Sequence, residues 1–240
     1  MIRIVYLHGF ASGPQSSKAR YFRTLLEGAG AHVDVPDLAD GDFEHLTITA
    51  QLAVIDRAAG SHPVSLIGSS LGGYLAALYA ARHSQVRRVV LLAPAFGFAQ
   101  RWPERLGPAA VAAWRRTGTI DVFHYAGNRN RQLGYQLLAD GERFEAYPDF
   151  TQPALIFHGA HDDAVPVRYS EEFAAAHPNA SPKSSTPATI CSMSSTTWRP
   201  RSSVSWQTEP SRSTIDPTRG RPLARLRHAR SLQPAPEKVL

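Results

Sequence analysis

The stretch that decides the fold is Pro63-Val64-Ser65-Leu66-Ile67-Gly68-Ser69-Ser70-Leu71-Gly72-Gly73-Tyr74. Residues 64–67 form a short apolar run, which is typical of a buried strand. Residues 71–81 are rich in Ala and Leu, which predicts a helix that begins almost at once. The pattern Gly68-x-Ser70-x-Gly72 falls on the turn between the two.

Ser70 is the candidate nucleophile of this turn. A strand that runs directly into a helix forces the residue at the turn into strained φ and ψ angles, so the residues two before and two after it must lack side chains. Ser70 has glycine at both positions, whereas Ser69 has Ile67 and Leu71 there. The hydroxyl of Ser70 would then stand at a helix N-terminus, where the amide of Leu71 points at any oxyanion that forms.

The alternation of strands and helices predicts an α/β fold. Apolar runs predict strands at residues 2–7, 31–35, 64–67, 86–92 and 153–157. Helical periodicity or composition predicts helices that start near Ser16 or Ser17, at Ile48 and at Leu71. This order is typical of a mostly parallel sheet with helices on both faces, whose chemistry gathers at the carboxyl ends of the strands. His8-Gly9-Phe10 and Ser70 both fall at such ends.

Residues 95–150 interrupt the alternation, and among Arg, Gly and Asn they carry aromatic residues that include Trp102, Trp114, Phe123, Tyr125, Tyr135, Phe144 and Tyr147. One interpretation is a helical insertion that packs its own aromatic side chains. The other is a small lid that shapes an apolar substrate pocket. The two interpretations are compatible.

A candidate acid follows the strand at residues 153–157. The loop after a late strand is where the carboxylate of a Ser-Asp-His triad belongs in chain order, and it would orient a histidine and stabilise the imidazolium. Position alone leaves Asp162 and Asp163 open, and either one is equally well explained as a solvated turn residue or a helix cap.

Together these motifs resemble the α/β-hydrolase superfamily, and within it the small YqiA-like bacterial esterases and their acyl-protein-thioesterase relatives. The resemblance covers residues 1–180 and rests on Leu7-His8-Gly9-Phe10 with its following loop, on Gly68 to Gly73, and on His158-Gly159-x-x-Asp162-x-x-Val165-Pro166. It implies that Asp162 is the acid and that the backbone amides of Phe10 and Leu71 hold the oxyanion. It also implies hydrolysis of esters or thioesters through an acyl-enzyme, with no metal or organic cofactor.

The mechanism needs a general base, because a serine hydroxyl at its ordinary pKa is a poor nucleophile at neutral pH. The resemblance implies a histidine one strand after the acid, yet the sequence holds none between His177 and His228. His158 and His161 on the acid loop, His177 at a helix end and His228 are weak substitutes. Without this histidine, we expect the rate of ester hydrolysis to fall by several orders of magnitude.

The last 60 residues change in character, since 27 of them are Ser, Thr or Pro. We expect disorder from about residue 181, with no strand or amphipathic helix. Residues 181–240 are either a basic low-complexity tail or a segment translated out of frame. With permitted codons, a shifted frame over residues 183–207 reads as a strand end, a Gly-His turn and an amphipathic helix. The recovered histidine falls at the position of Thr189, after the last strand.

The distribution of charge along the chain argues against nucleic-acid binding. The net charge is +6, but residues 1–180 carry 16 basic and 17 acidic side chains, so the excess belongs to the last quarter of the chain. Nucleic-acid binding ranks last, because those charges lack interleaved aromatics and a folded platform. The single cysteine, Cys191, and the absence of a signal-like or membrane-spanning stretch predict a soluble cytoplasmic protein.

The sequence therefore predicts a serine esterase or thioesterase that acts on a small-molecule substrate. Two rivals remain: a catalytically impaired, frame-shifted hydrolase without its base, and a binding protein that reuses the hydrolase pocket.

Overall fold

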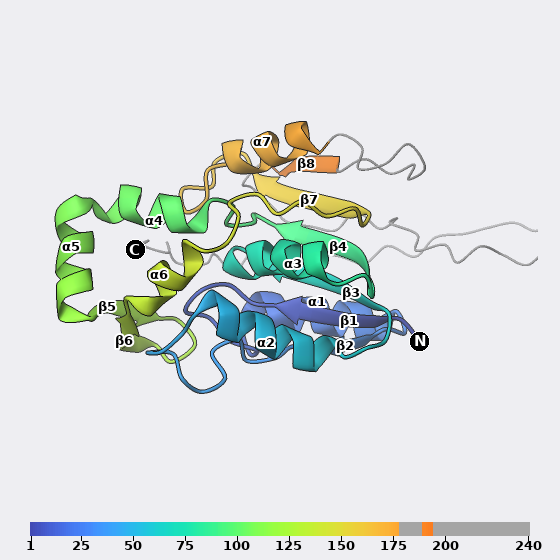
Figure 1. Ribbon diagram of the computed structural model, residues 1–240. Coiled ribbons are helices and arrows are strands. Elements are labelled where there is room, and N and C mark those ends of the chain that lie inside the picture. Colours follow the sequence, from blue (N-terminus) through green and yellow to red (C-terminus); the bar gives the residue numbers. More distant parts are fainter. Residues whose placement is uncertain (178–188, 194–240) are drawn as a thin grey trace, which may run out of the picture. The chain divides into compact units, whose positions relative to one another are not determined.

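A six-stranded parallel sheet forms the centre of the fold, with strands in the order β2-β1-β3-β4-β7-β8 (Figure 1). The computed structural model describes residues 1–177 and 189–193. The strands of the sheet are β1 Arg3–Leu7, β2 His32–Asp34, β3 Val64–Ser69, β4 Val86–Leu92, β7 Ala154–Gly159 and β8 Thr189–Met193. The predicted α/β class with a parallel sheet is confirmed.

The order of the strands places the candidate site. From β1 the chain moves to β2 on one side and later to β3 on the other, so the direction of winding reverses between β1 and β3. Ligands of open α/β sheets bind at such a switch point, outside the carboxyl ends of the strands. Register sets Leu7 opposite Gly68, so the loop after β1 starts beside the turn after β3.

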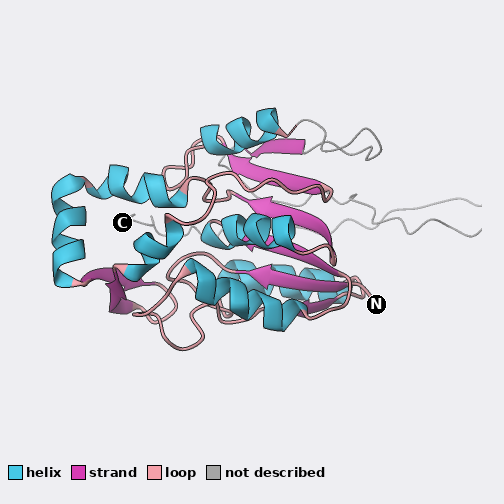
Figure 2. Ribbon diagram, viewed as in Figure 1, coloured by secondary structure: helices cyan, strands magenta, loops and turns pink. Residues whose placement is uncertain are grey.

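Helices cover both faces of the sheet (Figure 2). The helix α1, Ser17–Gly28, packs on one face, where Tyr6 and Phe22 stack with ring centroids 5.6 Å apart. The opposite face carries α2, Ile48–Ala59, α3, Leu71–Arg82, and α7, Arg168–Ala176, in the larger apolar core. Within α3 every residue from Leu71 to Ala80 is buried, which explains its nearly uniform Ala and Leu composition.

Residues between β4 and β7 form an insertion at the carboxyl edge of the sheet (Figure 1). Its elements are α4 Phe98–Leu106, α5 Pro108–Thr117, β5 Thr119–His124, β6 Arg129–Gly134 and α6 Gln136–Gly141. The antiparallel hairpin of β5 and β6 corrects the expectation of a purely helical insertion. The aromatic core is present as expected: Trp114 is fully buried, and its Nε1–H donates to the Leu133 carbonyl at 3.0 Å.

The strand β8 lies inside the segment for which the sequence predicts no regular structure, and at these five residues that prediction is wrong. Its backbone pairs with β7 from Leu155↔Thr189 to Gly159↔Met193. Without β8, the N–H and C=O groups along the outer edge of β7 would lack strand partners. The expected boundary near residue 180 and the remainder of the expected disordered tail lie outside the described residues.

No helix in the described ranges is both long and apolar enough to cross a membrane.

Candidate active site

Ser70 occupies a strained turn between β3 and α3. Its backbone angles are φ 52° and ψ −118°, a conformation that costs a non-glycine residue roughly 1–3 kcal/mol. A Cβ on Gly68 would lie 2.2 Å from the Gly72 carbonyl oxygen, and one on Gly72 would lie 2.2 Å from the Leu7 carbonyl oxygen. Both flanking positions therefore require glycine, as the pattern predicts.

Backbone hydrogen bonds hold this turn in place. The N–H of Ser70 donates to the Leu92 carbonyl at 2.9 Å. The carbonyl of Ser70 accepts from Gly73 at 2.9 Å and from Ala95 at 3.0 Å. The strain at Ser70 is thus balanced by contacts with α3 and with the chain after β4.

The loop after β1 lies against Ser70. A Cβ placed on Gly9 would be 3.5 Å from the Cβ of Ser70. The amides of Phe10 and Leu71 make no hydrogen bond with any described residue. Leu71 is the first residue of the twelve-residue helix α3, whose N-terminus favours negative charge. Two free donors next to Ser70 are what an oxyanion hole requires.

His8 fixes the shape of this loop, a role that sequence reasoning did not assign. The residue is 4 % exposed. Nε2 accepts from the Leu38 N–H at 3.1 Å, so the ring proton is on Nδ1, which donates to the Gly9 carbonyl at 3.0 Å. Burial lowers the pKa of His8, although the Gly9 carbonyl and Asp37 oppose that effect. His8 is therefore a neutral structural residue with both nitrogens engaged.

Asp162 and Asp163 differ clearly in their surroundings. Asp162 is half-buried, and its Oδ1 accepts the N–H groups of Ala164 at 2.9 Å and Val165 at 2.8 Å. Its Oδ2 has no partner among the described residues. Asp163 is exposed. An acid of a triad needs one oxygen fixed by its own loop and the other free for a histidine, and Asp162 has this arrangement.

Ser70 and Asp162 follow strands that are separated by one other strand. β4 lies between β3 and β7, with Ser69 opposite Leu92 and Leu92 opposite Phe157. Strands in a sheet lie about 4.8 Å apart, so β3 and β7 are about 10 Å apart. The two side chains therefore need a bridging group, which is the position of the histidine in a triad.

None of the described histidines makes that bridge by a hydrogen bond to Ser70. His158 is buried, with Nδ1 paired to Ser170 at 2.7 Å and Nε2 donating to the Val165 carbonyl at 2.7 Å. His177 donates from Nδ1 to the Phe173 carbonyl at 2.7 Å, and His161 is exposed. His228 lies outside the described residues.

Aromatic side chains connect the loop after β1 with the insertion. Phe10 packs edge-on against Trp102 of α4, with ring centroids 5.1 Å apart, and against Phe43 at 5.7 Å. Trp102 continues to Phe98 at 5.6 Å and to Trp114 at 5.5 Å. Phe10, in the loop after β1, is thus joined through Trp102 to the aromatic core of the insertion.

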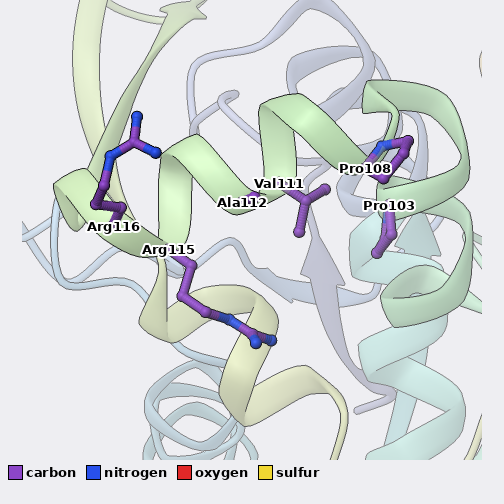
Figure 3. A pocket seen from close by; sticks show the side chains of 6 residues that line it. All are labelled: Pro103, Pro108, Val111, Ala112, Arg115 and Arg116. Carbon is purple, nitrogen blue, oxygen red and sulfur yellow. The ribbon is translucent and has the colours of Figure 1, made fainter.

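An open hollow of about 560 Å³ lies elsewhere, on the α4 and α5 side of the insertion (Figure 3). Its lining consists of Pro103, Pro108, Val111, Ala112, Arg115 and Arg116. The hollow includes neither Ser70 nor Asp162, so we assign the candidate site to the strained turn at Ser70 and not to this hollow. Among the described residues, no cluster of His, Cys, Asp and Glu is suited to hold a metal ion.

Residues 3–179 match the model of a family described as "Uncharacterised protein family (UPF0227)". The chain belongs to this family. It is also 28% identical over 202 residues to the pimeloyl-[acyl-carrier protein] methyl ester esterase of Xylella fastidiosa, covering 68% of this chain and 77% of that protein.

Solved structures confirm the α/β-hydrolase fold. The putative hydrolase from Agrobacterium vitis superposes with a TM-score of 0.63 at 23% identity, over 80% of each chain. Est1E from Butyrivibrio proteoclasticus, solved with ferulic acid, gives a TM-score of 0.62 at 20% identity, over 81% of this chain and 80% of that one. At these identities the likeness concerns the fold.

Proposed function

We propose that this fold serves serine-dependent hydrolysis of carboxylic esters or thioesters. The observation that carries the proposal is Ser70 in a strained strand-to-helix turn, beside a loop that brings a second free backbone amide. A non-glycine residue in such a conformation is typical of functional sites. The α/β-hydrolase fold and the similarity to a Xylella protein named as a methyl ester esterase support the same class.

In the proposed reaction, the Ser70 Oγ attacks the acyl carbon and loses its proton to a general base. The amides of Phe10 and Leu71 donate to the oxyanion of the tetrahedral intermediate. The base returns the proton to the leaving alcohol or thiol, and an acyl-enzyme on Ser70 remains. Water then attacks that acyl group by the same route, while Asp162 orients the base and stabilises its charged form.

The base is the part of the triad that this chain does not supply from its described residues. We propose that residues from about 181 onward are read out of frame and that the shifted frame restores the histidine. In the present frame Thr189 begins β8 opposite Leu155, near the amino end of β7, so a histidine there would lie at the edge away from Ser70.

The shifted frame must therefore pair a different segment with β7. Its strand ends near residue 186, which places a histidine at position 189 just after the strand and on the carboxyl edge. The connection from the end of α7 at Ala176 to that strand then falls within the usual length for such loops.

An apolar acyl or aryl group suits the site best. Phe10 and Trp102 are half-buried aromatic residues beside the amide that would hold the oxyanion, so a bound acyl group contacts them. A single cysteine in the sequence supports a cytoplasmic location.

Turnover of p-nitrophenyl acetate and butyrate by three purified forms tests the proposal. These are the chain as given, its Ser70→Ala variant, and a chain rebuilt with the shifted frame from about residue 181. We expect the rebuilt form alone to be fast and Ser70→Ala in that background to abolish its activity. Equal activity of the chain as given would show that another group acts as base. Binding without turnover by every form, together with no labelling of Ser70 by a fluorophosphonate, would favour a binding protein.

A further inference from the structure

Arg101, on the first turns of α4, reaches across to the acid loop. Its Nη2 donates to the Ala164 carbonyl at 2.6 Å, a contact between residues 63 positions apart in the sequence. Its guanidinium also lies over the ring of Tyr169, with 5.0 Å between Cζ and the ring centroid. The insertion is thereby tied to the loop between β7 and α7.

The peptide that Arg101 binds is the same one that holds Asp162. The Ala164 carbonyl and the Val165 N–H belong to one peptide unit, and that N–H donates to Asp162 Oδ1 at 2.8 Å. A positive charge on the carbonyl side polarises the unit and strengthens the bond that its N–H donates. Two consecutive hydrogen bonds thus connect the Arg101 guanidinium, through this peptide unit, to the Asp162 carboxylate.

Arg101 is partly enclosed where it makes this contact. Burial lowers the pKa of its guanidinium, and the nearby Asp162 carboxylate opposes that effect. The guanidinium remains charged in proteins, so the charge is placed here at a desolvation cost. The start of α4 is equally close-packed, since a Cβ on Gly97 would lie 3.4 Å from the Tyr169 ring.

The next residue along α4 contacts the other half of the site. Trp102 packs edge-on against Phe10, whose amide is the proposed oxyanion donor. Neighbouring residues of α4 therefore contact both the loop that holds Phe10 and the loop that holds Asp162.

We propose that Arg101 is a positioning residue for Asp162: through the Ala164–Val165 peptide it fixes Oδ1, so that Oδ2 is presented to the base. This inference rests on the proposed function for the role of Asp162, but the contact itself can be tested separately. The insertion is then a structural part of the catalytic centre.

The test compares Arg101→Met, Arg101→Lys and the control Arg105→Met, one turn further along the same helix. Arg105 is exposed and makes no contact with the acid loop among the described residues. Hydrogen exchange in the chain as given should show the Ala164 and Val165 amides exchanging about tenfold faster in Arg101→Met, with no change in Arg105→Met. Unchanged exchange in Arg101→Met, or an equal increase in Arg105→Met, would overturn the inference.

Kinetics then test the catalytic role in the form that shows Ser70-dependent turnover. We expect Arg101→Met to lower kcat about tenfold at an unchanged KM, because a charged hydrogen bond that orients the acid is lost. Arg101→Lys should recover part of kcat, and Arg105→Met should retain all of it. A wild-type kcat in Arg101→Met refutes the role of Arg101 alone. If no form shows Ser70-dependent turnover, the proposed function fails and the catalytic role of Arg101 fails with it, while exchange still decides whether Arg101 holds the loop.

Discussion

At the scale of single residues, the turn at Ser70 forms only because its flanking glycines have no Cβ atom. A methyl group at Gly72 would collide with the Leu7 and His8 carbonyl oxygens, at 2.2 and 2.5 Å, and neither backbone can move without disturbing β1. We expect Gly72→Ala to lower the free energy of unfolding by about 2 kcal/mol or more. Gly28→Ala is the matched control, since nothing lies within 4 Å of its added methyl. It sits in the last turn of α1, where alanine should stabilise by up to ~1 kcal/mol. Urea denaturation measures the free energy of unfolding of both variants. If Gly72→Ala and Gly28→Ala change it in the same direction, the collision at Gly72 is not the cause.

Also at this scale, His8 makes stability depend on pH. The pKa of His8 is lowered in the folded chain by burial, so the unfolded chain binds the proton more readily. Its contribution is fully present above the unfolded pKa of about 6.5, and it is lost as pH falls from there toward the lower folded value. We expect the urea midpoint to fall between pH 7.5 and 5.5, and to fall less in His8→Gln. The exposed His62→Gln should behave as wild type. If the urea midpoint of His8→Gln depends on pH as strongly as that of the wild type, His8 is not the cause of this pH dependence.

Local sequence predicts single residues well where the constraint is local. Gly68 is predictable because the collision it avoids, with the Gly72 carbonyl, is only four residues away. Gly72 avoids the Leu7 carbonyl at the end of β1, so the sequence shows its role only through the Gly-x-Ser-x-Gly pattern. The choice between Asp162 and Asp163 is left open by position, although an Asx turn onto Ala164 and Val165 is a local feature. Arg101 is not readable at all, because its partner lies 63 residues away and depends on how the insertion folds back.

At the scale of elements, apolar runs locate the buried strands but not the hairpin or β8. The run predicted at residues 86–92 coincides with β4. β6 is mostly polar, and β5 has only three apolar residues among its six. The turn that joins them contains Gly127-Asn128 in place of the familiar Asn-Gly pair, and Asn128 has φ 47°. β8 is defined by its pairing with β7 more than by its own composition.

That pairing predicts the effect of a proline in β8. Ile190→Pro places a residue with a fixed φ and no backbone N–H in the strand opposite Ile156, which disturbs the pairing of β8 with β7. We expect faster amide exchange along β7, measured on the peptide that covers residues 154–159, by about tenfold. Ile190→Thr, which keeps the donor and suits a strand, is the control. Equal exchange in both variants would show that β8 does not protect β7.

At the scale of the whole molecule, the two faces of the sheet are unequally covered. Val90, Leu92, Leu155 and Phe157 point to the face that α1 shares, and all four are half-buried. Among the described helices only α1 packs there, against β1 and its neighbours. The proposed shifted frame would supply an amphipathic helix after its last strand, and this face is the apolar surface that such a helix needs.

The rebuilt chain should therefore differ from the chain as given in stability as well as in activity. Full burial of each of the four side chains contributes on the order of 1 kcal/mol beyond its half-buried state. We expect the rebuilt chain to unfold at a higher temperature and to bind less of the dye ANS, which reports exposed apolar surface. Ser70→Ala in the rebuilt chain is the control, because it removes turnover and leaves this face unchanged. If the rebuilt chain gains activity but neither stability nor lower dye binding, the shifted frame supplies the base without a covering helix. If it gains none of the three, the present frame is the natural one and the open face needs another explanation.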